Sequence, residues 1–267
     1  MKKVRFAMLA AAAALLVFGA FALVACAGSS SAPGGNTLKV AVREGLTKFS
    51  TYNESANTFY GFEDDLAKEL AAQLGYADVE FVGVVANERE KALDDGKADC
   101  LIAAFSETPD RASKYDLSEP YYYDNGRVMV ATSTLFESFA DLQGCRVGTL
   151  RGTDVSEVLA STLARKGLIP STSATSLAQF LTLVTFESYA DMYQAVQNGR
   201  VDALCADGCI TLPWIGSEMK YLDEPYSEEN YVVATPKGSA LSEKVNQAVQ
   251  TLKENGTVQR LMEKWDI

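Results

Sequence analysis

The strongest structural signal in the chain is the stretch from residue 61 to residue 82, which reads GFEDDLAKELAAQLGYADVEFV. One buried face of an α-helix is expected where apolar residues recur every four positions, as they do at Phe62, Leu66, Leu70 and Leu74. Gly75 is typical of a helix end. The apolar run at residues 79–82 predicts a strand, so the stretch is half of a βαβ unit.

The same alternation continues on both sides of this stretch. Residues 38–42 predict a strand before the helix, and residues 87–95 predict a second helix that ends at Gly96. Residues 98–105 then predict a buried strand. The resulting βαβαβ order favours a mostly parallel sheet.

A second run of alternating elements follows a break at residues 120–126. Its elements are predicted strands at 145–149, 181–186 and 201–206, helices at 153–165 and 189–197, and a short helix from Asp207. Because both runs have the same order of elements, we predict an α/β protein with two similar lobes. Residues 166–180, rich in Ser, Thr and Ala, look like an insertion on the surface of the second lobe.

The end of the chain is expected to return to the first lobe. A strand is predicted at 231–234 and helices at 239–255 and 257–265. Lobe 1 then comprises residues 37–123 and 231–267 and lobe 2 residues 127–223, with hinge crossings near 124–126 and 224–230. In such a body a ligand cleft is expected between the lobes, at the carboxyl ends of the strands.

The first 36 residues predict export. Three basic residues precede an apolar run that ends in LVAC at residues 23–26, a pattern that resembles a bacterial lipobox. We interpret residues 1–25 as a lipoprotein signal peptide, Cys26 as the lipid-modified residue and residues 26–36 as a flexible tether. The protein would then be extracytoplasmic and anchored to the cell membrane by lipid. An uncleaved membrane helix is the alternative, because the run approaches the ~20 residues that span a bilayer.

Charge and composition exclude several classes of function. The chain has 24 basic and 35 acidic residues, a net charge of −11, and no histidine. An acidic surface argues against nucleic acid and against anionic lipid as partners. The lack of histidine excludes Ser-His-Asp and Cys-His catalysis and removes the usual ligand of catalytic zinc. No metal ion or other cofactor is predicted.

The remaining cysteines favour free thiols. With Cys26 assigned to lipid, an even set is left, namely Cys100, Cys145, Cys205 and Cys209. An exported protein permits disulfides, but two of the four lie in strand-like apolar runs, where cysteine is often a small buried residue. Free buried thiols are therefore expected first, a Cys205–Cys209 bridge second and a metal site third.

Several short segments follow one another in a recognisable order. They are GFEDDLAKEL at 61–70, GKAD at 96–99, TPDRA at 108–112, FADLQG at 139–144, NGRVDA at 198–203, YVVATPKG at 231–238, TLKENGT at 251–257 and KW at 264–265. In order and spacing they resemble the extracellular solute-binding proteins of amino-acid ABC importers, family 3, from residue 38 to residue 267 apart from 166–180. The resemblance implies a two-lobed periplasmic-binding-protein fold of type II that closes on an amino acid, with an ABC transporter permease as partner.

The resemblance assigns the ligand α-carboxylate to Arg111, with Ser106 and the backbone of Ala104 beside it. Thr108 is a good helix N-cap and Pro109 suits the first helical position. A helix start offers free N–H groups, and an arginine adds a planar fork that can grip a carboxylate. A solvated helix arginine paired with a neighbouring acid is the alternative.

The opposite lobe is expected to supply further contacts to the ligand. The family's acid that accepts hydrogen bonds from the α-ammonium corresponds to Asp207, for which a plain helix N-cap is the alternative. Gly152 and Thr153 fit the family segment that binds the α-carboxylate. Asp154 departs from that pattern, because its carboxylate would repel the ligand carboxylate. We expect Asp154, with Glu157, to cap the helix and point away, or else to meet a ligand amine.

Preference for the ligand side chain depends on Arg43 and Arg89. The stretch REGLTKF at residues 43–49 aligns with the first loop of the glutamate- and aspartate-binding branch, which places an arginine at both positions. Two guanidiniums would fit a dicarboxylic ligand and repel lysine or arginine. Surface positions for both arginines are the alternative, and cystine or another polar amino acid stays open.

The sequence therefore predicts a monomeric binding protein, not an enzyme, that captures a polar amino acid, with glutamate or aspartate favoured. The alternative is an enzyme on the same fold that resembles cyclohexadienyl or arogenate dehydratase, with Glu44 or Asp154 as its general acid. A sensor that passes ligand occupancy to a separate receptor is a third class.

Overall fold

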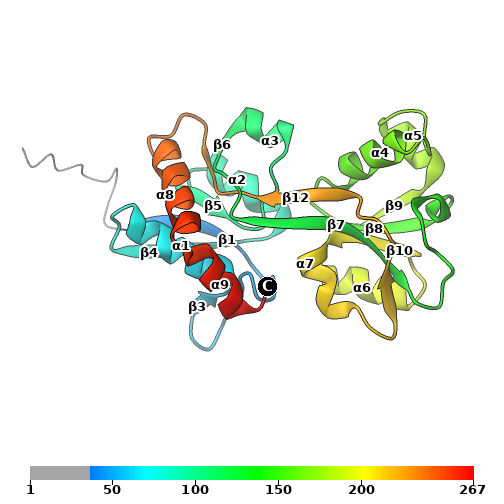
Figure 1. Ribbon diagram of the computed structural model, residues 1–267, viewed down its shortest axis with the longest axis horizontal. Helices are drawn as coiled ribbons and strands as arrows, with labels where there is room; N and C mark the ends of the chain where they lie inside the picture. Colours follow the sequence, from blue (N-terminus) through cyan, green and yellow to red (C-terminus); the bar gives the residue numbers. More distant parts are fainter. Residues whose placement is uncertain (1–36) are drawn as a thin grey trace, which may run out of the picture. The chain divides into compact units, whose positions relative to one another are not determined.

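The structure of the protein, a computed structural model, describes residues 37–267. The predicted signal peptide, Cys26 and the tether lie outside the described residues. Figure 1 shows two groups of strands and helices joined by two neighbouring strands, β7 (Tyr122–Ala131) and β12 (Ser227–Tyr231). No helix in the described part of the chain is both long and apolar enough to cross a bilayer.

Lobe 1 is built on a five-stranded sheet in the order β4-β1-β5-β13-β6. The strands are β1 (Thr37–Arg43), β4 (Asp78–Val84), β5 (Cys100–Ile102), β6 (Tyr115–Leu117) and β13 (Ala234–Pro236). The strand β1 is parallel to β4 and β5, as the βαβαβ pattern predicts, whereas β13 is antiparallel to its neighbours. A hairpin of β2 (Thr51–Asn53) and β3 (Thr58–Tyr60) lies apart from this sheet and was not predicted.

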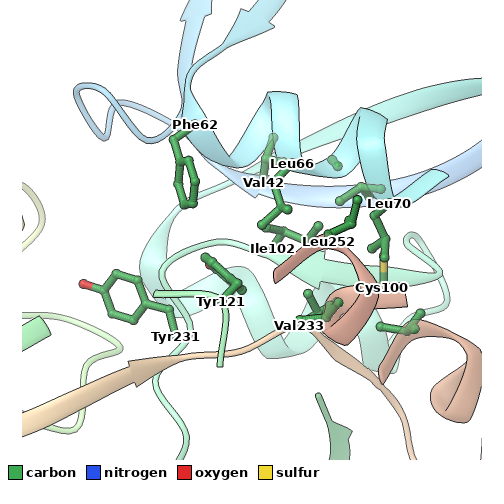
Figure 2. Packing of buried hydrophobic residues seen from close by; sticks show 14 of the residues in the cluster. Val42, Phe62, Leu66, Leu70, Cys100, Ile102, Tyr121, Tyr231, Val233 and Leu252 are labelled. Carbon is green, nitrogen blue, oxygen red and sulfur yellow. The ribbon is translucent and has the colours of Figure 1, made fainter. Parts of the chain in front are cut away.

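The helices of lobe 1 are α1 (Phe62–Gln73), α2 (Arg89–Asp94), α3 (Pro109–Lys114), α8 (Ser242–Glu254) and α9 (Thr257–Trp265). Figure 2 shows Leu66 and Leu70 of α1 in the core with Ile102 and Leu252, and all four are buried. Burial of one leucine side chain contributes about 1.5–3 kcal/mol. The four-residue periodicity therefore identified the face of α1 that holds this lobe together.

Lobe 2 contains a mixed sheet in the order β11-β7-β10-β8-β9, with β12 paired to β7. Its remaining strands are β8 (Arg146–Leu150), β9 (Thr182–Phe186), β10 (Ala203–Asp207) and β11 (Met219–Tyr221). The strand β8 is parallel to β9 and β10, so the second run repeats the parallel arrangement of the first. Its helices are α4 (Val155–Arg165), α5 (Ala174–Phe180), α6 (Tyr189–Gln197) and α7 (Gly208–Thr211).

The segment 166–180 is more than a surface insertion. It contains α5, which begins at the N-cap Ser173, whose side chain accepts a hydrogen bond from the N–H of Ser176. Leu177 and Phe180 are buried in the core of lobe 2. Because the segment is rich in Ser and Thr, the sequence did not indicate these two core residues, which lie three positions apart on a short helix.

The strands that join the lobes lie side by side. They pair antiparallel, with Tyr122 opposite Tyr231 and Gly126 opposite Ser227. The rings of Tyr122 and Tyr231 stack with their centroids 5.6 Å apart, and Phe49 meets Tyr122 edge-on at 5.1 Å. The predicted hinge crossing near 124–126 therefore falls within β7, and residues 227–230 of the second predicted crossing fall within β12. Their role as a hinge stays a prediction.

Within residues 37–267 the four cysteines are free. Cys100 and Cys205 are fully buried, which raises the pKa of both thiols, while Cys145 and Cys209 are half-buried. No group of three or more Cys, Asp and Glu side chains in this part of the chain is arranged to hold a metal ion.

Candidate functional site

A small cavity brings together residues from both lobes. It is lined by Arg43, Arg89, Ala104, Ser106, Arg111, Thr153, Asp154, Tyr189 and Asp207. Arg43 ends β1, Asp207 ends β10 and Tyr189 begins the helix after β9. The cavity therefore lies at the carboxyl ends of strands, where ligands of α/β proteins bind. Eight of the nine residues predicted to bind ligand line this one cavity.

Arg111 is held by the local structure that the sequence predicts. Thr108 caps α3 and accepts a hydrogen bond from the backbone N–H of Arg111 at 3.2 Å. The guanidinium is buried, lies 4.1 Å from the centroid of the Phe105 ring and donates through Nη1 to the carbonyl of Ser106 at 2.7 Å. Across the cleft the same Nη1 lies 4.0 Å from Oδ2 of Asp154. Arg111 is therefore a fixed cation that faces both lobes.

Arg89 lines the cavity, but its donors are largely committed to the protein backbone. Its Nε donates to the carbonyl of Ala86 at 2.9 Å and its Nη1 to the carbonyls of Ala103 and Ala104. Its Nη2 donates to the carbonyl of Gly152, in lobe 2, at 3.0 Å. Burial lowers the pKa of Arg89 to about 10, with Arg43 and Arg111 adding to the shift, so the side chain stays protonated at neutral pH. This arginine links the lobes.

Arg43 has a different environment. It is 6% exposed, and its guanidinium lies 5.5 Å from the centroid of the Tyr189 ring. No hydrogen bond or ion pair within residues 37–267 uses its side chain. A buried guanidinium carries five N–H donors, and leaving them without partners is costly. In the described part of the chain, Arg43 is therefore a cavity cation whose N–H donors are all free for another group.

Asp207 is held from outside its own strand. The hydroxyl of Tyr231, at the end of β12, donates a hydrogen bond to its Oδ2. Burial raises the pKa of Asp207 to about 8, and the charge of Glu229 adds to this shift. Cys209 lies two residues after Asp207, and its backbone N–H donates a hydrogen bond to Oδ2 of Asp124, in β7, at 2.8 Å. Both joining strands thus fix the corner that carries Asp207.

The segment 152–154 approaches lobe 1 closely. Gly152 has φ +79°, and a Cβ there would lie 2.4–2.7 Å from the N, Cα and Cβ atoms of Asn87. The hydroxyl of Thr153 donates to the carbonyl of Leu150 at 2.8 Å. Asp154 occupies the N-cap position of α4, but the expectation that its side chain caps the helix and points away is wrong. Asp154 makes no capping hydrogen bond and lines the cavity, where its charge is drawn to Arg111.

The sequence did not identify Tyr189 as a site residue. Tyr189 follows the N-cap Ser188 and packs against buried residues of both lobes. The available signal was its place directly after a strand end, at the same edge of the sheet as Asp207. Glu44, one of the two acids considered for an enzyme, is exposed and lies outside the cavity, with its carboxylate against Gly83.

A wider groove adjoins the cavity and shares Arg111, Thr153 and Asp154 with it. Six further acids line this groove: Glu90, Glu107, Asp110, Glu157, Glu228 and Glu229. Clefts lined by charge of one sign focus the electrostatic field and alter the approach of charged ligands. The groove is therefore strongly negative, whereas the cavity contains three arginines and two aspartates.

Residues 38–266 match the sequence profile of the bacterial extracellular solute-binding proteins, family 3. The ABC transporter arginine-binding protein 1 of Escherichia coli (strain K12) is 26% identical over 217 residues, which are 78% of this chain and 82% of that protein. The ABC transporter glutamine-binding protein GlnH of Bacillus subtilis (strain 168) is 26% identical over 222 residues, 81% and 76% of the two chains.

The fold is shared with solved structures. An ancestral arginine-binding protein bound to arginine has a TM-score of 0.72 at 30% identity, and the match covers 86% of this chain and 98% of that one. The predicted two-lobed fold of the type II periplasmic binding proteins is therefore confirmed.

Proposed function

Because the chain belongs to the bacterial extracellular solute-binding proteins, family 3, we propose that it captures one amino acid between its lobes and delivers it to the permease of an ABC importer. The observation that carries the proposal is that Arg111 of lobe 1 and Asp207 of lobe 2 line the same cavity. The related proteins named above are, by name, binding proteins for arginine and glutamine, which supports an amino acid as the class of ligand.

The two charged groups shared by all amino acids have matching partners here. Arg111 donates through Nη1 to the carbonyl of Ser106, and its Nε lies 3.5 Å from Oε1 of Glu90, so Nη2 is the nitrogen left for an α-carboxylate. Asp207 accepts hydrogen bonds from an α-ammonium. Charges taken out of water must be paired, so a ligand with both groups fits the cavity better than one with a single charge.

Within this class we propose a polar and acidic ligand, with glutamate or aspartate favoured. The support is Arg43, whose buried guanidinium has no hydrogen-bond or ion-pair partner among the described residues. Arg89 contributes less than expected, because its donors serve backbone carbonyls. The preference for an acidic side chain therefore depends mainly on one arginine.

We propose further that the protein is a monomeric lipoprotein, anchored through Cys26 on the outer face of the cell membrane. The sequence LVAC at residues 23–26 and the tether at 26–36 support this location. Mass spectrometry of the membrane-extracted protein tests it, because a diacylglycerol on Cys26 is expected and an intact residue 1–25 segment contradicts it.

An enzyme on the same fold is disfavoured by the positions of its two candidate acids. Glu44 lies outside the cavity, and Oδ2 of Asp154 lies 4.0 Å from Nη1 of Arg111, so its nearest charged neighbour is a cation of the proposed binding site. Incubation with prephenate or arogenate is therefore expected to give no aromatic product.

A thermal-shift screen of the twenty amino acids on residues 27–267 tests the proposed function. Glutamate or aspartate should raise the melting temperature, and Arg111→Ala should abolish the shift. If basic amino acids stabilise the protein and acidic ones do not, the proposal that Arg43 binds a side-chain carboxylate is wrong. If no amino acid stabilises it, the proposed class of ligand is wrong.

A further inference from the structure

Glu63 is a buried carboxylate directly behind the cavity wall. It lies in the first turn of α1 and is 0% exposed. Its Oε1 accepts hydrogen bonds from the backbone N–H of Ala104 at 2.7 Å and from the hydroxyl of Tyr121 at 2.5 Å. Its Oε2 has no hydrogen-bond partner among residues 37–267. A buried carboxyl group with one oxygen left unpaired calls for a structural or functional explanation.

Ala104 is the cavity residue that Glu63 holds. Its φ of +45° is rare for a residue with a Cβ and costs of order 1–2 kcal/mol unless neighbouring contacts enforce it. Those contacts are the hydrogen bond from its N–H to Glu63 and the hydrogen bond that its carbonyl accepts from Arg89. The turn that brings Ala104 and then Ser106 to the cavity is thus fixed between an acid and an arginine.

Glu63 lies close enough to Arg43 and Arg89 for its carboxylate, when ionised, to interact with both of their charges. Burial raises the pKa of Glu63, and the hydrogen bonds from Tyr121 and Ala104 together with the charges of Arg43 and Arg89 oppose this shift. The first turn of a helix favours a negative charge through the helix dipole. Arg43 and Arg89 line the cavity, whereas Glu63 lies behind them and does not line it.

We propose that Glu63 is a positioning residue of the ligand cavity, which holds Ala104 in its left-handed conformation and reduces the positive charge that Arg43 and Arg89 present to the ligand. The second part rests on the proposed function, whereas the first concerns the protein without ligand.

The neighbouring residue provides a matched control. Asp64 is also 0% exposed and in the first turn of α1, and one of its oxygens likewise has no hydrogen-bond partner within residues 37–267. Its other oxygen accepts a hydrogen bond from the hydroxyl of Ser50 at 2.9 Å. Asp64 does not line the cavity. A change that only disturbs the buried start of α1 should therefore affect both residues alike.

Hydrogen exchange of the ligand-free protein tests the positioning role. Glu63→Ala should speed exchange of the Ala104 amide by about tenfold, the effect of losing one buried hydrogen bond, relative to Asp64→Asn at matched global stability. Glu63→Gln keeps an acceptor and should leave this amide protected. Equal exchange in the Ala and Asn variants overturns the positioning role, whether or not any amino acid binds.

Calorimetric titration with glutamate and glutamine tests the charge role, because the two ligands differ by one charge at nearly equal size. Glu63→Gln should shift the ratio of their dissociation constants toward glutamate by about tenfold, or about 1.4 kcal/mol, and Asp64→Asn should leave the ratio unchanged. A loss of both affinities in equal proportion overturns the charge role, since a purely structural effect does not distinguish the ligands. If wild-type protein binds neither, the proposed ligand preference fails and the exchange experiment still decides the positioning role.

Discussion

The hydroxyl of Tyr231 donates a hydrogen bond to the carboxylate of Asp207 and so connects a strand that joins the lobes to an acid in the cavity. Tyr231 is fully buried and also forms a β-bridge with Ser106 on the other wall. The position of Asp207 therefore depends on β12 as well as on its own strand, and the bond can respond to movement between the lobes.

We predict that amino-acid affinity rises with pH up to about pH 8. Burial and the charge of Glu229 raise the pKa of Asp207 to about 8, so below that pH its carboxyl is largely protonated and cannot pair with an ammonium. Affinity should fall by about tenfold per pH unit below this value, and binding at pH 7 should release about one proton. Titration calorimetry in buffers of different ionisation enthalpy measures both effects. Binding without proton release contradicts the prediction, and Asp207→Asn should give a flat, weak profile.

Gly152→Ala should keep the lobes from closing. The added Cβ would lie 2.4–2.7 Å from Asn87 in lobe 1, so affinity should drop by more than tenfold, or about 1.4 kcal/mol or more. Gly144→Ala is the control, because Gly144 has a similar φ of +77° but nothing within 4 Å of its Cβ position. Both variants carry the strain of a positive φ. X-ray scattering with saturating ligand should show a larger radius of gyration for Gly152→Ala alone, and equal radii would disprove this close contact as the cause.

Arg43→Gln should separate acidic from neutral ligands. The free guanidinium of Arg43 is proposed to pair with a side-chain carboxylate, and removal of a charged hydrogen-bond partner costs about 1.5–3 kcal/mol. Glutamate should therefore bind at least tenfold more weakly, with little change for glutamine. Arg89→Gln should weaken the binding of glutamate and of glutamine alike, because Arg89 connects the backbone of Ala104 to that of Gly152 and is not proposed to contact the ligand side chain. A uniform loss in the Arg43 variant rejects the assignment.

The association rate of an anionic ligand should increase with salt. The groove beside the cavity carries six acids in addition to Asp154, and salt screens their repulsion of a negatively charged ligand. Stopped-flow measurement with glutamate should show a faster association at high ionic strength, with glutamine as the neutral control. A rate that falls as salt is added would mean that the ligand does not enter through this groove.

Asp64→Asn should stabilise the protein at pH 8 and much less at pH 4. Burial raises the pKa of Asp64 to about 7 from 3.8, so the folded protein holds a proton that the unfolded chain has released. Asp64 should therefore contribute a fall of about 1.4 kcal/mol per unit between pH 4 and pH 7 to the free energy of unfolding. Asp64→Asn should lack this contribution and keep the one from Asp207, whose pKa is also raised.

The next residue offers a control of opposite sign. Burial would raise the pKa of Asp65, but hydrogen bonds from Lys264 and Trp265 outweigh it and lower the pKa. Its contribution to stability is present at neutral pH and lost as pH falls through the lowered pKa. Asp65→Asn should therefore destabilise the protein at pH 8. Urea unfolding at both pH values measures each variant, and a stabilising Asp65→Asn would refute this assignment of charges.

Much of the site could be predicted because its residues follow from local rules. Arg111 lies one turn into a helix with a recognisable cap at Thr108, and Asp207 directly follows an apolar strand. The carboxyl ends of parallel strands meet at one edge, so such positions converge without knowledge of the packing.

The errors share a physical cause, which is contact between segments distant in sequence. The predicted strand at 98–105 ends at Ile102, because Ala104 adopts a left-handed backbone conformation. A hydrogen bond from its N–H to Glu63, 41 residues away, stabilises this conformation. Asp154 was expected to cap its helix, but Arg111 of the other lobe attracts it. The position of Tyr189 after a strand was the one signal in the sequence, and its contact with Arg43 of the other lobe could not be read from it.

The chain enters and leaves lobe 2 through adjacent strands, with Asp124 paired to Glu229. Residues 124–229 are thus one continuous insert whose two ends lie together. Exchange of the corresponding gene segment between relatives would replace half of the cavity wall in a single recombination event and leave the other half intact. Such an exchange keeps Arg43, Arg89 and Arg111 of this chain's first lobe and combines them with a different second wall.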